Sequence, residues 1–173
     1  ETVIMMGTEF LKEEPFKNIY VHALVRDEKG QKMSKSKGNV IDPLELIEKY
    51  SADALRFTLL SMASPGRDVK LSEDRVKGYR NFLNKIWNAN NFLRQNECDF
   101  SDIKKPEILK LTINKWILSE LVKVKNDTEN SLKNYRFDEA AKNIYQFVWH
   151  SFCDWYLEPV SYTHLTLPTI SRV

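Results

Sequence analysis

The chain has 173 residues, of which 42% are hydrophobic and 29% are charged, and its formal net charge at pH 7 is +2. This composition is typical of a folded globular protein of one domain or two small ones and excludes an intrinsically disordered chain. A net charge this small does not indicate nucleic-acid binding, so any argument for an RNA ligand must rest on local patches.

The sequence also lacks the signals of membrane, secreted and metal-binding proteins. No apolar run approaches the roughly 18 residues of a membrane-spanning helix, and the first residues have no signal-peptide pattern. The two cysteines, Cys98 and Cys153, lie far apart and match no metal-ligand spacing. We therefore expect a cytoplasmic protein with reduced thiols, without a metal site and without a membrane partner.

In chain order, the first expected element is a strand over residues 18–26. This run is nearly continuously apolar and is bounded by Pro15 and by the turn-forming residues 27–30, a pattern typical of a strand buried on both faces of a parallel sheet. Such a strand needs neighbours, which we expect to precede Glu1. His22 lies within the run, where a buried core histidine is the commoner role and a place lining a nucleotide site is the alternative.

Residues 29–39, K-G-Q-K-M-S-K-S-K-G-N, are the most distinctive stretch and predict a loop. Four lysines, two serines and two glycines make up most of it: Lys29, Lys32, Lys35, Lys37, Ser34, Ser36, Gly30 and Gly38. Ammonium groups, hydroxyls and accessible backbone N–H groups together suit a polyphosphate. A solvated loop, a nuclear-import signal and a nucleic-acid patch are alternatives. A Walker-type phosphate loop is excluded, because Gly38 is followed by Asn39 rather than by Lys-Ser or Lys-Thr.

Two short helices are expected after this lysine loop. Asp42 and Pro43 suit the cap and the first position of a helix that ends at Tyr50. Ser51 can cap the next helix. The buried stripe of that second helix is expected to contain Leu55, Leu59 and Met62. Residues 64–68 contain adjacent Pro and Gly, the strongest break in the chain, and we predict the domain boundary near them.

Beyond this break the apolar residues recur with a helical period of about 3.6 residues. Three long helices are expected, the first capped by Ser72, the second capped by Thr112, and the third opening at Phe137 and stopped by Pro159. Their inward faces are expected to contain Val76, Tyr79, Leu83, Ile86, Asn90 and Leu93; then Trp116, Leu121, Val124, Thr128 and Leu132; then Ala141, Ile144, Val148, Phe152 and Trp155. The polar residues 97–110 predict a connection. Three long amphipathic helices with short connections predict a helical bundle.

The order of residues in the lysine loop carries a family resemblance. Lys32-Met33-Ser34-Lys35-Ser36 spells K-M-S-K-S, and the loop thereby resembles the signature of the class I aminoacyl-tRNA synthetases. The similarity continues through residues 5–7, 15–16, 20–27, 37–43 and 53–57. Residues 66–68 and 78–89 resemble the valyl branch of this family more than the isoleucyl or leucyl branches. The resemblance covers roughly residues 1–160.

The resemblance implies a mostly α fold in three parts. Residues 1–66 would be the C-terminal piece of a Rossmann-type nucleotide-binding α/β domain, with one or two strands plus short helices. Residues 67–160 would be an antiparallel α-helical bundle that binds the anticodon, and residues 161–173 an irregular tail unlike the family. The family usually has glycine where this chain has Ser51, and we expect the change to cost about 1 kcal/mol or less.

In this family the loop takes part in amino-acid activation by ATP and Mg²⁺. The resemblance implies that Lys32 and Lys35 are catalytic and contact the pyrophosphate, with Lys35 the more critical. Met33, Ser34 and Ser36 would join both lysines in binding ATP. His22 is a further candidate for the ATP site.

A class I synthetase also carries an H-I-G-H motif, in which two histidines are three residues apart. His22, His150 and His164 lack this spacing. We therefore expect the chain to begin inside the catalytic domain and to be inactive by itself.

Residues 72–95 are the most informative stretch for tRNA binding, because cations alternate with aromatic residues: Arg75, Lys77, Arg80, Lys85 and Arg94 with Tyr79, Phe82, Trp87 and Phe92. Cations can hold the RNA backbone, and exposed rings can stack on unpaired bases. Tyr79 and Trp87 are expected in the core instead. By resemblance to the valyl branch, Lys85, Phe92 and Arg80 are the candidates for tRNA contact, with a core role as the alternative for the ring.

The implied partners are valine tRNA, ATP and valine, bound by a monomeric enzyme. Two alternatives stay open from the sequence. One is a non-catalytic tRNA-binding module, in which the lysine loop is only a phosphate contact. The other is the same region of an isoleucyl-type synthetase.

Overall fold

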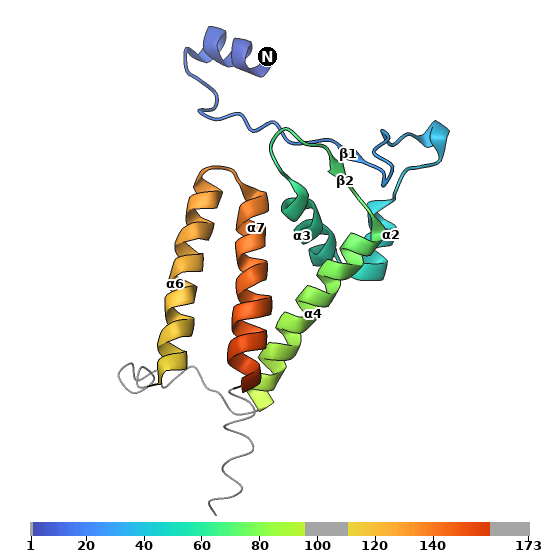
Figure 1. Cartoon of the computed structure of the whole chain (residues 1–173). Coiled ribbons are helices and arrows are strands. Elements are labelled where there is room, and N and C mark those ends of the chain that lie inside the picture. The colour runs from blue at the N-terminus through green and yellow to red at the C-terminus, as the bar shows by residue number, and fades with distance from the viewer. Residues whose placement is uncertain (1, 96–110, 160–173) are drawn as a thin grey trace, which may run out of the picture.

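The computed structural model describes residues 2–95 and 111–159. Most of these residues are helical, as Figure 1 shows, so the predicted mostly α class is confirmed. The helical elements are α1 (Thr2–Met6), η1 (Gly7–Leu11), η2 (Lys35–Lys37), α2 (Pro43–Tyr50), α3 (Ala52–Met62), α4 (Glu73–Gln95), α6 (Thr112–Lys133), α7 (Phe137–Gln146) and η3 (Phe147–Leu157). None of the helices within these ranges is both long and apolar enough to cross a bilayer.

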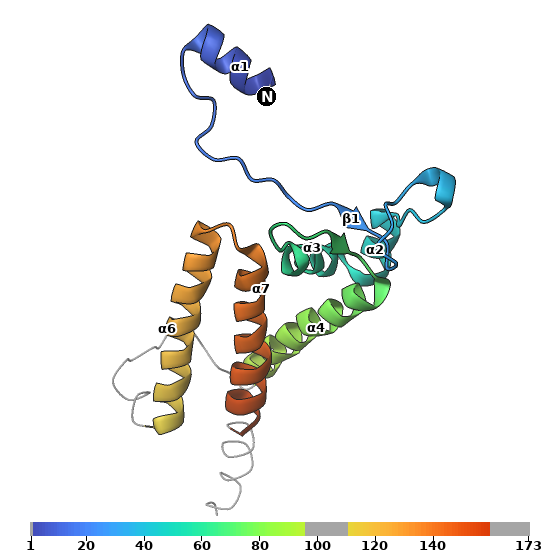
Figure 2. The same cartoon turned by 45° about the horizontal axis from the view of Figure 1, so that its top comes forward.

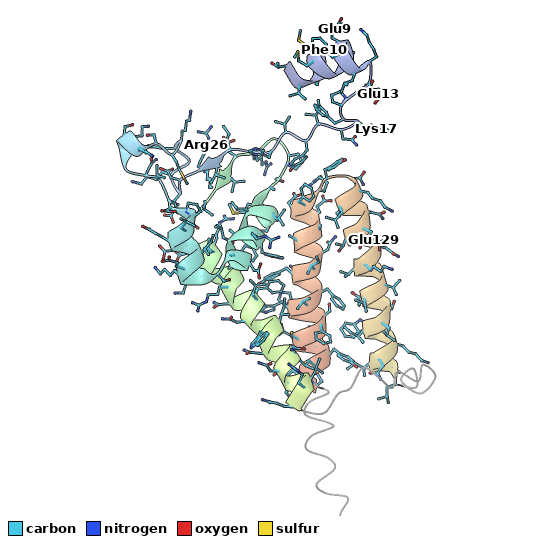
Figure 3. The ribbon with its side chains drawn as sticks, turned by 180° about the vertical axis from the view of Figure 1, so that it is seen from behind. Glu9, Phe10, Glu13, Lys17, Arg26 and Glu129 are labelled. Carbon is cyan, nitrogen blue, oxygen red and sulfur yellow. The ribbon has the colours of Figure 1, made fainter. Side chains whose placement is uncertain are left out.

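A small parallel sheet joins the segment just before the lysine loop to the segment just before α4. Strand β1 (Val25–Arg26) pairs with β2 (Val69–Lys70), so that Val25 lies opposite Val69 and Arg26 opposite Lys70. Arg26 also forms an ion pair with Asp68, and Figure 3 shows Arg26 at this junction. The sheet therefore holds the lysine loop, which begins just after β1, close to the start of α4.

The predicted strand over residues 18–26 is wrong in extent and in burial. Only Val25 and Arg26 are in β conformation, and most of the preceding residues are exposed. One neighbour of this strand, β2, follows it in sequence. The expectation of further neighbours before Glu1 stays a prediction. The physical reason is that this apolar run has no sheet to pack against in the described part of the chain. His22 is consequently exposed rather than a core residue, with its Nδ1 2.8 Å from the Ala23 carbonyl oxygen.

The segment before this strand extends away from the other helices. Figures 1 and 2 show α1 and η1 beyond the end of the helical bundle, and Figure 3 labels Glu9 and Phe10 there. Phe10 and Leu11 are exposed. This part contributes nothing to the core described next.

Helices α2 and α3 begin and end as the sequence predicts. The Asp42 carboxylate accepts a hydrogen bond from the Leu44 N–H at 2.8 Å, which caps α2, and the helix ends at Tyr50. Ser51 then caps α3, because its hydroxyl accepts from the Ala54 N–H at 3.3 Å. Ser51 has φ 89°, a conformation that favours glycine, as expected for a helix end at which the family has Gly.

The core beneath these two helices continues across the predicted domain boundary. Its buried residues are Leu46, Tyr50, Ala54, Leu55, Leu71 and Val76. They come from α2 and α3 before the break at residues 64–68 and from β2's exit and α4 after it. Leu59 packs against this core and Leu55 is buried within it, as predicted. The division at residue 66 stays a prediction.

A second core is built from aromatic rings where α3, α4 and the α7–η3 helix meet. Phe82 is only 1% exposed, and its ring centroid lies 5.2 Å from that of Phe57, 4.8 Å from that of Tyr145 and 6.3 Å from that of Trp149. Tyr79 joins the same cluster, 5.0 Å from Phe57. Offset and tilted rings at these distances attract one another beyond the area they bury.

This packing corrects the inward face predicted for α4. Phe82 is buried and cannot stack on a base, whereas Trp87, expected in the core, is 64% exposed. Ile86 and Asn90 are exposed as well. A helical period defines a stripe of residues, but the positions of α3 and α7 decide how that stripe is rotated, and here they cover the side of α4 that carries Phe82.

Helices α6 and α7 form an antiparallel pair, and α6 lies at the outside of the bundle (Figures 1 and 2). Ile117 and Ser131 are its buried residues, while the expected core residues Trp116, Leu121 and Leu132 are exposed. Val124 and Thr128 of the same predicted face are half-buried. The prediction was wrong for the other three residues because α6 packs against α7 and η3 along one narrow seam rather than against a closed bundle. The helix begins at Thr112, with Leu111 instead of Thr112 at the cap position.

The last helix opens at Phe137 and continues to Pro159, as predicted, with a π-helical stretch in η3. Ala141 is buried on its inner face, but Ile144 and Trp155 are exposed. Cys153 is a free, buried thiol. The predicted connection over residues 97–110, including Cys98, and the tail over residues 161–173 lie outside the described residues.

Candidate functional site

The lysine loop projects from the molecule between β1 and α2, at the side opposite α6 (Figure 1). Both of its glycines have positive φ, 77° for Gly30 and 63° for Gly38, which turn the chain at each end of the loop. Between them, Lys35–Lys37 form the 3₁₀ turn η2, and the Gly38 N–H donates to the Lys35 carbonyl at 3.2 Å. The loop predicted over residues 29–39 is confirmed.

Two residues of the loop are anchored while its cations remain accessible. The Met33 side chain packs against the core formed by α2, α3 and α4. Lys32 forms an isolated antiparallel bridge with Arg26, so its backbone is held against β1. The side chains of Lys32 and Lys35 are nevertheless exposed, which leaves both ammonium groups available to an anion.

The two hydroxyls predicted to line an ATP site lie together. Ser34 Oγ and Ser36 Oγ are 3.2 Å apart, on the same turn as Lys35. His22 lies in the exposed segment before β1. The structure thus groups Lys32, Met33, Ser34, Lys35 and Ser36 on one small loop.

Sequence reasoning missed the residues that tie this loop together, Asp27 and Asn39. The Asn39 amide accepts a hydrogen bond from the Ser34 N–H at 3.0 Å and donates to Asp27 Oδ2 at 2.8 Å and to the Lys32 carbonyl at 3.3 Å. Asp27 Oδ1 accepts from the Gln31 N–H at 2.6 Å. The available signals were an Asp three residues before Gly30 and an Asn directly after Gly38, both common turn positions.

These bonds also act on the charge of Asp27. The Asn39 side chain, and next the Gln31 N–H, hold the pKa of the Asp27 carboxyl below its usual value. Hydrogen bonds that a carboxylate accepts favour its ionised form. Asp27 is therefore a fixed anion at the base of a loop of cations.

Behind the loop a groove of about 630 Å³ separates it from α2 and the start of α4. Its lining includes Lys29 and Lys37 from the loop, the cap residue Asp42 and Lys49 of α2, and Glu73 from α4. Lys49 pairs with Glu73, and the Tyr50 hydroxyl donates to the same carboxylate at 2.7 Å. Within the described ranges, no group of three or more His, Cys, Asp or Glu side chains is placed to hold a metal ion.

The second candidate site lies on α4, facing the end of η3. Lys85 and Phe92 line one pocket of about 290 Å³, together with Ala89, Cys153 and Asp154 among others. The structure therefore brings together two of the three residues predicted to contact tRNA. Arg80 is exposed on α4 but is not part of this pocket.

Lys85 is held in place by partners from η3 that the sequence did not reveal. Its Nζ donates to Asp154 Oδ1 at 2.5 Å and lies 4.3 Å from the centroid of the Trp149 ring. His150 Nδ1 is 3.3 Å from the other carboxylate oxygen of Asp154. The hydrogen bond from Lys85 lowers the pKa of Asp154 below its usual value. No local pattern connects residues 69 positions apart.

Comparisons with known protein families match both parts of the chain. The family described as tRNA synthetases class I (I, L, M and V) matches residues 1–72, which include the lysine loop and the core of α2 and α3. The family described as anticodon-binding domain of tRNA ligase matches residues 114–166, which include most of α6 and the α7–η3 helix.

Curated relatives show high identity to this chain over a small part of their own length. A valine–tRNA ligase of Pelagibacter ubique is 77% identical over 156 residues, which are 90% of this chain and 18% of that protein. The valine–tRNA ligases of Bartonella quintana and Rhizobium meliloti are 56% and 57% identical, again over 90% of this chain and 17% of each protein. The chain thus spans less than a fifth of the length of these relatives.

A solved structure has the same fold. It is the crystal structure of the ternary complex of Agrobacterium radiobacter K84 agnB2 LeuRS–tRNA–LeuAMS, with a TM-score of 0.73 over 88% of this chain and 20% of that chain. The sequences are 20% identical, so this likeness concerns the fold alone.

Proposed function

The chain belongs to the class I tRNA synthetase family, and we propose that it forms the part of a valine–tRNA ligase that carries the lysine loop and helices of the anticodon-binding domain. The observation that carries the proposal is the K-M-S-K-S loop, whose lysines are exposed and whose backbone is anchored by Met33. The names of the three relatives support valine, rather than isoleucine, as the amino acid.

The reaction would be activation of valine at the expense of ATP. A carboxylate oxygen of valine attacks the α-phosphorus of ATP, the bond from that phosphorus to the bridging oxygen breaks, and pyrophosphate leaves with the electron pair. Negative charge then grows on the pyrophosphate oxygens, so catalysis is mainly positioning and charge stabilisation. Mg²⁺ would enter with the triphosphate, whose oxygens are the ligands it prefers.

Lys32 and Lys35 would supply the positive charge that this step needs. Both extend from a loop closed by two left-handed glycines, so their ammonium groups can meet the departing pyrophosphate at one place. The paired hydroxyls of Ser34 and Ser36, with the backbone at Met33, would contact ATP beside them. His22 would approach the nucleotide from the segment before β1.

We further propose that Lys85 and Phe92 contact the anticodon arm of valine tRNA, with Arg80 holding the RNA backbone nearby. The shared pocket on α4 supports a base-sized contact, in which the Phe92 ring stacks and Lys85 is oriented by Asp154. The partners of the whole enzyme would be valine, ATP and this tRNA, bound in the cytoplasm by a monomer.

Valine-dependent pyrophosphate exchange in a full-length enzyme that contains this segment tests the proposal. Lys35→Ala should lower the exchange rate at least tenfold, because a preorganised charge contact is typically worth about 10²–10³ in rate. The affinity for tRNA should be nearly unchanged. Lys29→Ala is the matched control from the same loop and should leave the rate close to wild type. An unchanged rate for Lys35→Ala would refute the proposed role of the loop.

A further inference from the structure

The lysine loop is closed at its base by two side chains that sequence reasoning left without a role. Asp27 follows β1 directly and Asn39 precedes the cap of α2, so they stand at the two ends of the loop. Their side chains meet through the 2.8 Å hydrogen bond from Asn39 Nδ2 to Asp27 Oδ2. This contact ties the strand that enters the loop to the segment that leaves it.

Asn39 uses both halves of its amide in this position. Its oxygen accepts from the Ser34 N–H, and its nitrogen donates to Asp27 and to the Lys32 carbonyl. One acceptor and two donors on a short side chain are found in asparagine, and aspartate offers no donor. The backbone on either side of Met33 is thereby bound to a single amide.

Asp27 holds the opposite side of the same base. One of its oxygens accepts from Asn39 and the other accepts from the Gln31 N–H at 2.6 Å. A turn is completed by the Gly30 N–H, which donates to the Asp27 carbonyl at 2.9 Å. The latch, defined as Asp27 and Asn39 with these bonds, therefore fixes residues 31–34 and leaves the lysine side chains free to point outward.

We propose that Asp27 and Asn39 are positioning residues for the proposed activation step, because they hold Lys32 and Lys35 in a preorganised arrangement at the departing pyrophosphate. The inference rests on the proposed function of the loop. In this proposal both residues act through the loop and contact no reacting atom. Their effect is to reduce the reorganisation that the loop needs when charge develops in the transition state.

The latch should therefore act on the rate constant rather than on valine binding. Loss of the Asn39 bonds lets the loop sample other conformations, and fewer of them place both ammonium groups correctly. We expect kcat for pyrophosphate exchange to fall about tenfold or more, while KM for valine changes little. A merely structural role would lower the thermal stability and leave this kinetic split absent.

A reciprocal exchange of the two side chains gives a sharp test in the full-length enzyme that contains this segment. Asn39→Asp places two carboxylates against each other and removes both donors, so kcat should fall. Adding Asp27→Asn restores an amide opposite a carboxylate. In the double variant the Ser34 and Gln31 N–H groups keep their acceptors, and only the 3.3 Å bond to the Lys32 carbonyl is lost. The double variant should recover much of the lost kcat.

Asp42→Asn is the matched control, since it changes a nearby carboxylate to an amide and asparagine caps a helix as well as aspartate does. It should leave kcat and the melting temperature unchanged. The latch is overturned if Asn39→Asp retains wild-type kcat, or if the double variant recovers no activity.

Tryptic cleavage at the loop lysines provides a second measurement that does not depend on catalysis. Trypsin should cut the Asn39→Asp variant about fivefold faster or more than wild type, because this is the equilibrium effect of losing one net hydrogen bond. The double variant should be protected again. If the wild-type enzyme showed no valine-dependent exchange, the proposed function would fail, while equal cleavage of all variants would overturn the latch itself.

Discussion

Ser51 illustrates how one residue combines two conflicting demands. It ends α2 at φ 89° and ψ 151°, a backbone conformation that costs a residue with a Cβ atom about 1–3 kcal/mol. The same serine caps α3 by accepting from the Ala54 N–H. Glycine would meet the first demand and serine meets the second, which explains why either residue is compatible with this helix junction.

Ser51→Gly should therefore raise the free energy of unfolding by about 1 kcal/mol or less. Relief of the positive φ stabilises the folded state. Two smaller terms oppose it: loss of the serine cap costs a few tenths of a kcal/mol against glycine, and the added freedom of the unfolded chain costs about 0.5–1 kcal/mol. Ser51→Ala keeps the strain and loses the cap, so it should destabilise by about 1 kcal/mol. Urea unfolding of both variants checks this, and a stabilising Ser51→Ala would contradict the cap.

At the scale of elements, the start of α7 is held to the segment after α3 by a partly buried carboxylate. Asp138 is 15% exposed and pairs with Arg136, and the Ser64 hydroxyl donates to it at 2.8 Å. The hydrogen bond from Arg136, followed by that from Ser64, lowers the pKa of Asp138 below its usual value. The folded state therefore binds this proton less readily than the unfolded chain does.

The sign of the pH dependence follows from this lowered pKa. The stabilisation from Asp138 is fully present above its unfolded pKa of about 3.9 and is lost as the pH falls through the lower folded pKa. Asp138→Asn should therefore weaken the loss of thermal stability below about pH 4. Melting temperatures of both proteins at a series of acidic pH values measure the effect. Identical acid sensitivity would mean that other carboxylates, such as Glu73 and Asp154, carry it.

Helix α4 carries both aromatic residues of the core and the candidate RNA contact Phe92. Phe92→Ala should weaken binding of valine tRNA by about 1–3 kcal/mol if the ring stacks on a base. Phe82→Ala is the matched comparison. Removal of this buried ring should lower the free energy of unfolding by about 3–5 kcal/mol and should not alter anticodon preference in the folded protein. Measurements of tRNA binding test this prediction. If Phe92→Ala weakens binding equally for a tRNA without its anticodon loop, the ring has a structural role.

At the scale of the whole molecule, the two cores pack the lysine loop and the helices into one continuous unit that extends to α6. The α2–α3–α4 core holds Met33 of the loop, and the aromatic cluster around Phe82 attaches α7 to the same α4. The candidate nucleotide site and the candidate anticodon contact therefore share one helix as their common support.

This architecture predicts that the chain by itself binds valine tRNA with sequence preference. Binding should be weaker for a tRNA with a mutated anticodon, and the difference should persist when the salt concentration is raised. Filter binding at two salt concentrations measures both quantities. Equal, strongly salt-dependent binding of the two tRNAs would instead indicate only contacts of lysine and arginine with phosphates.

The sequence by itself determined the local features of this protein. The caps at Asp42 and Ser51, the turns at Gly30 and Gly38 and the start of α7 at Phe137 depend on neighbours within a few residues, and all of them were predicted. The K-M-S-K-S order indicated the family for the same reason, since it is a contiguous pattern.

Only the tertiary structure decided which faces are buried and which distant groups meet. Phe82 is buried instead of Trp87, most of residues 18–24 are exposed and β1 pairs with β2. All three outcomes depend on where the other elements lie. The Lys85–Asp154 pair and the Asp27–Asn39 latch likewise form between side chains that the fold brings together. A periodic pattern carries no information about these neighbours, because burial is a property of the assembled surfaces and not of the segment.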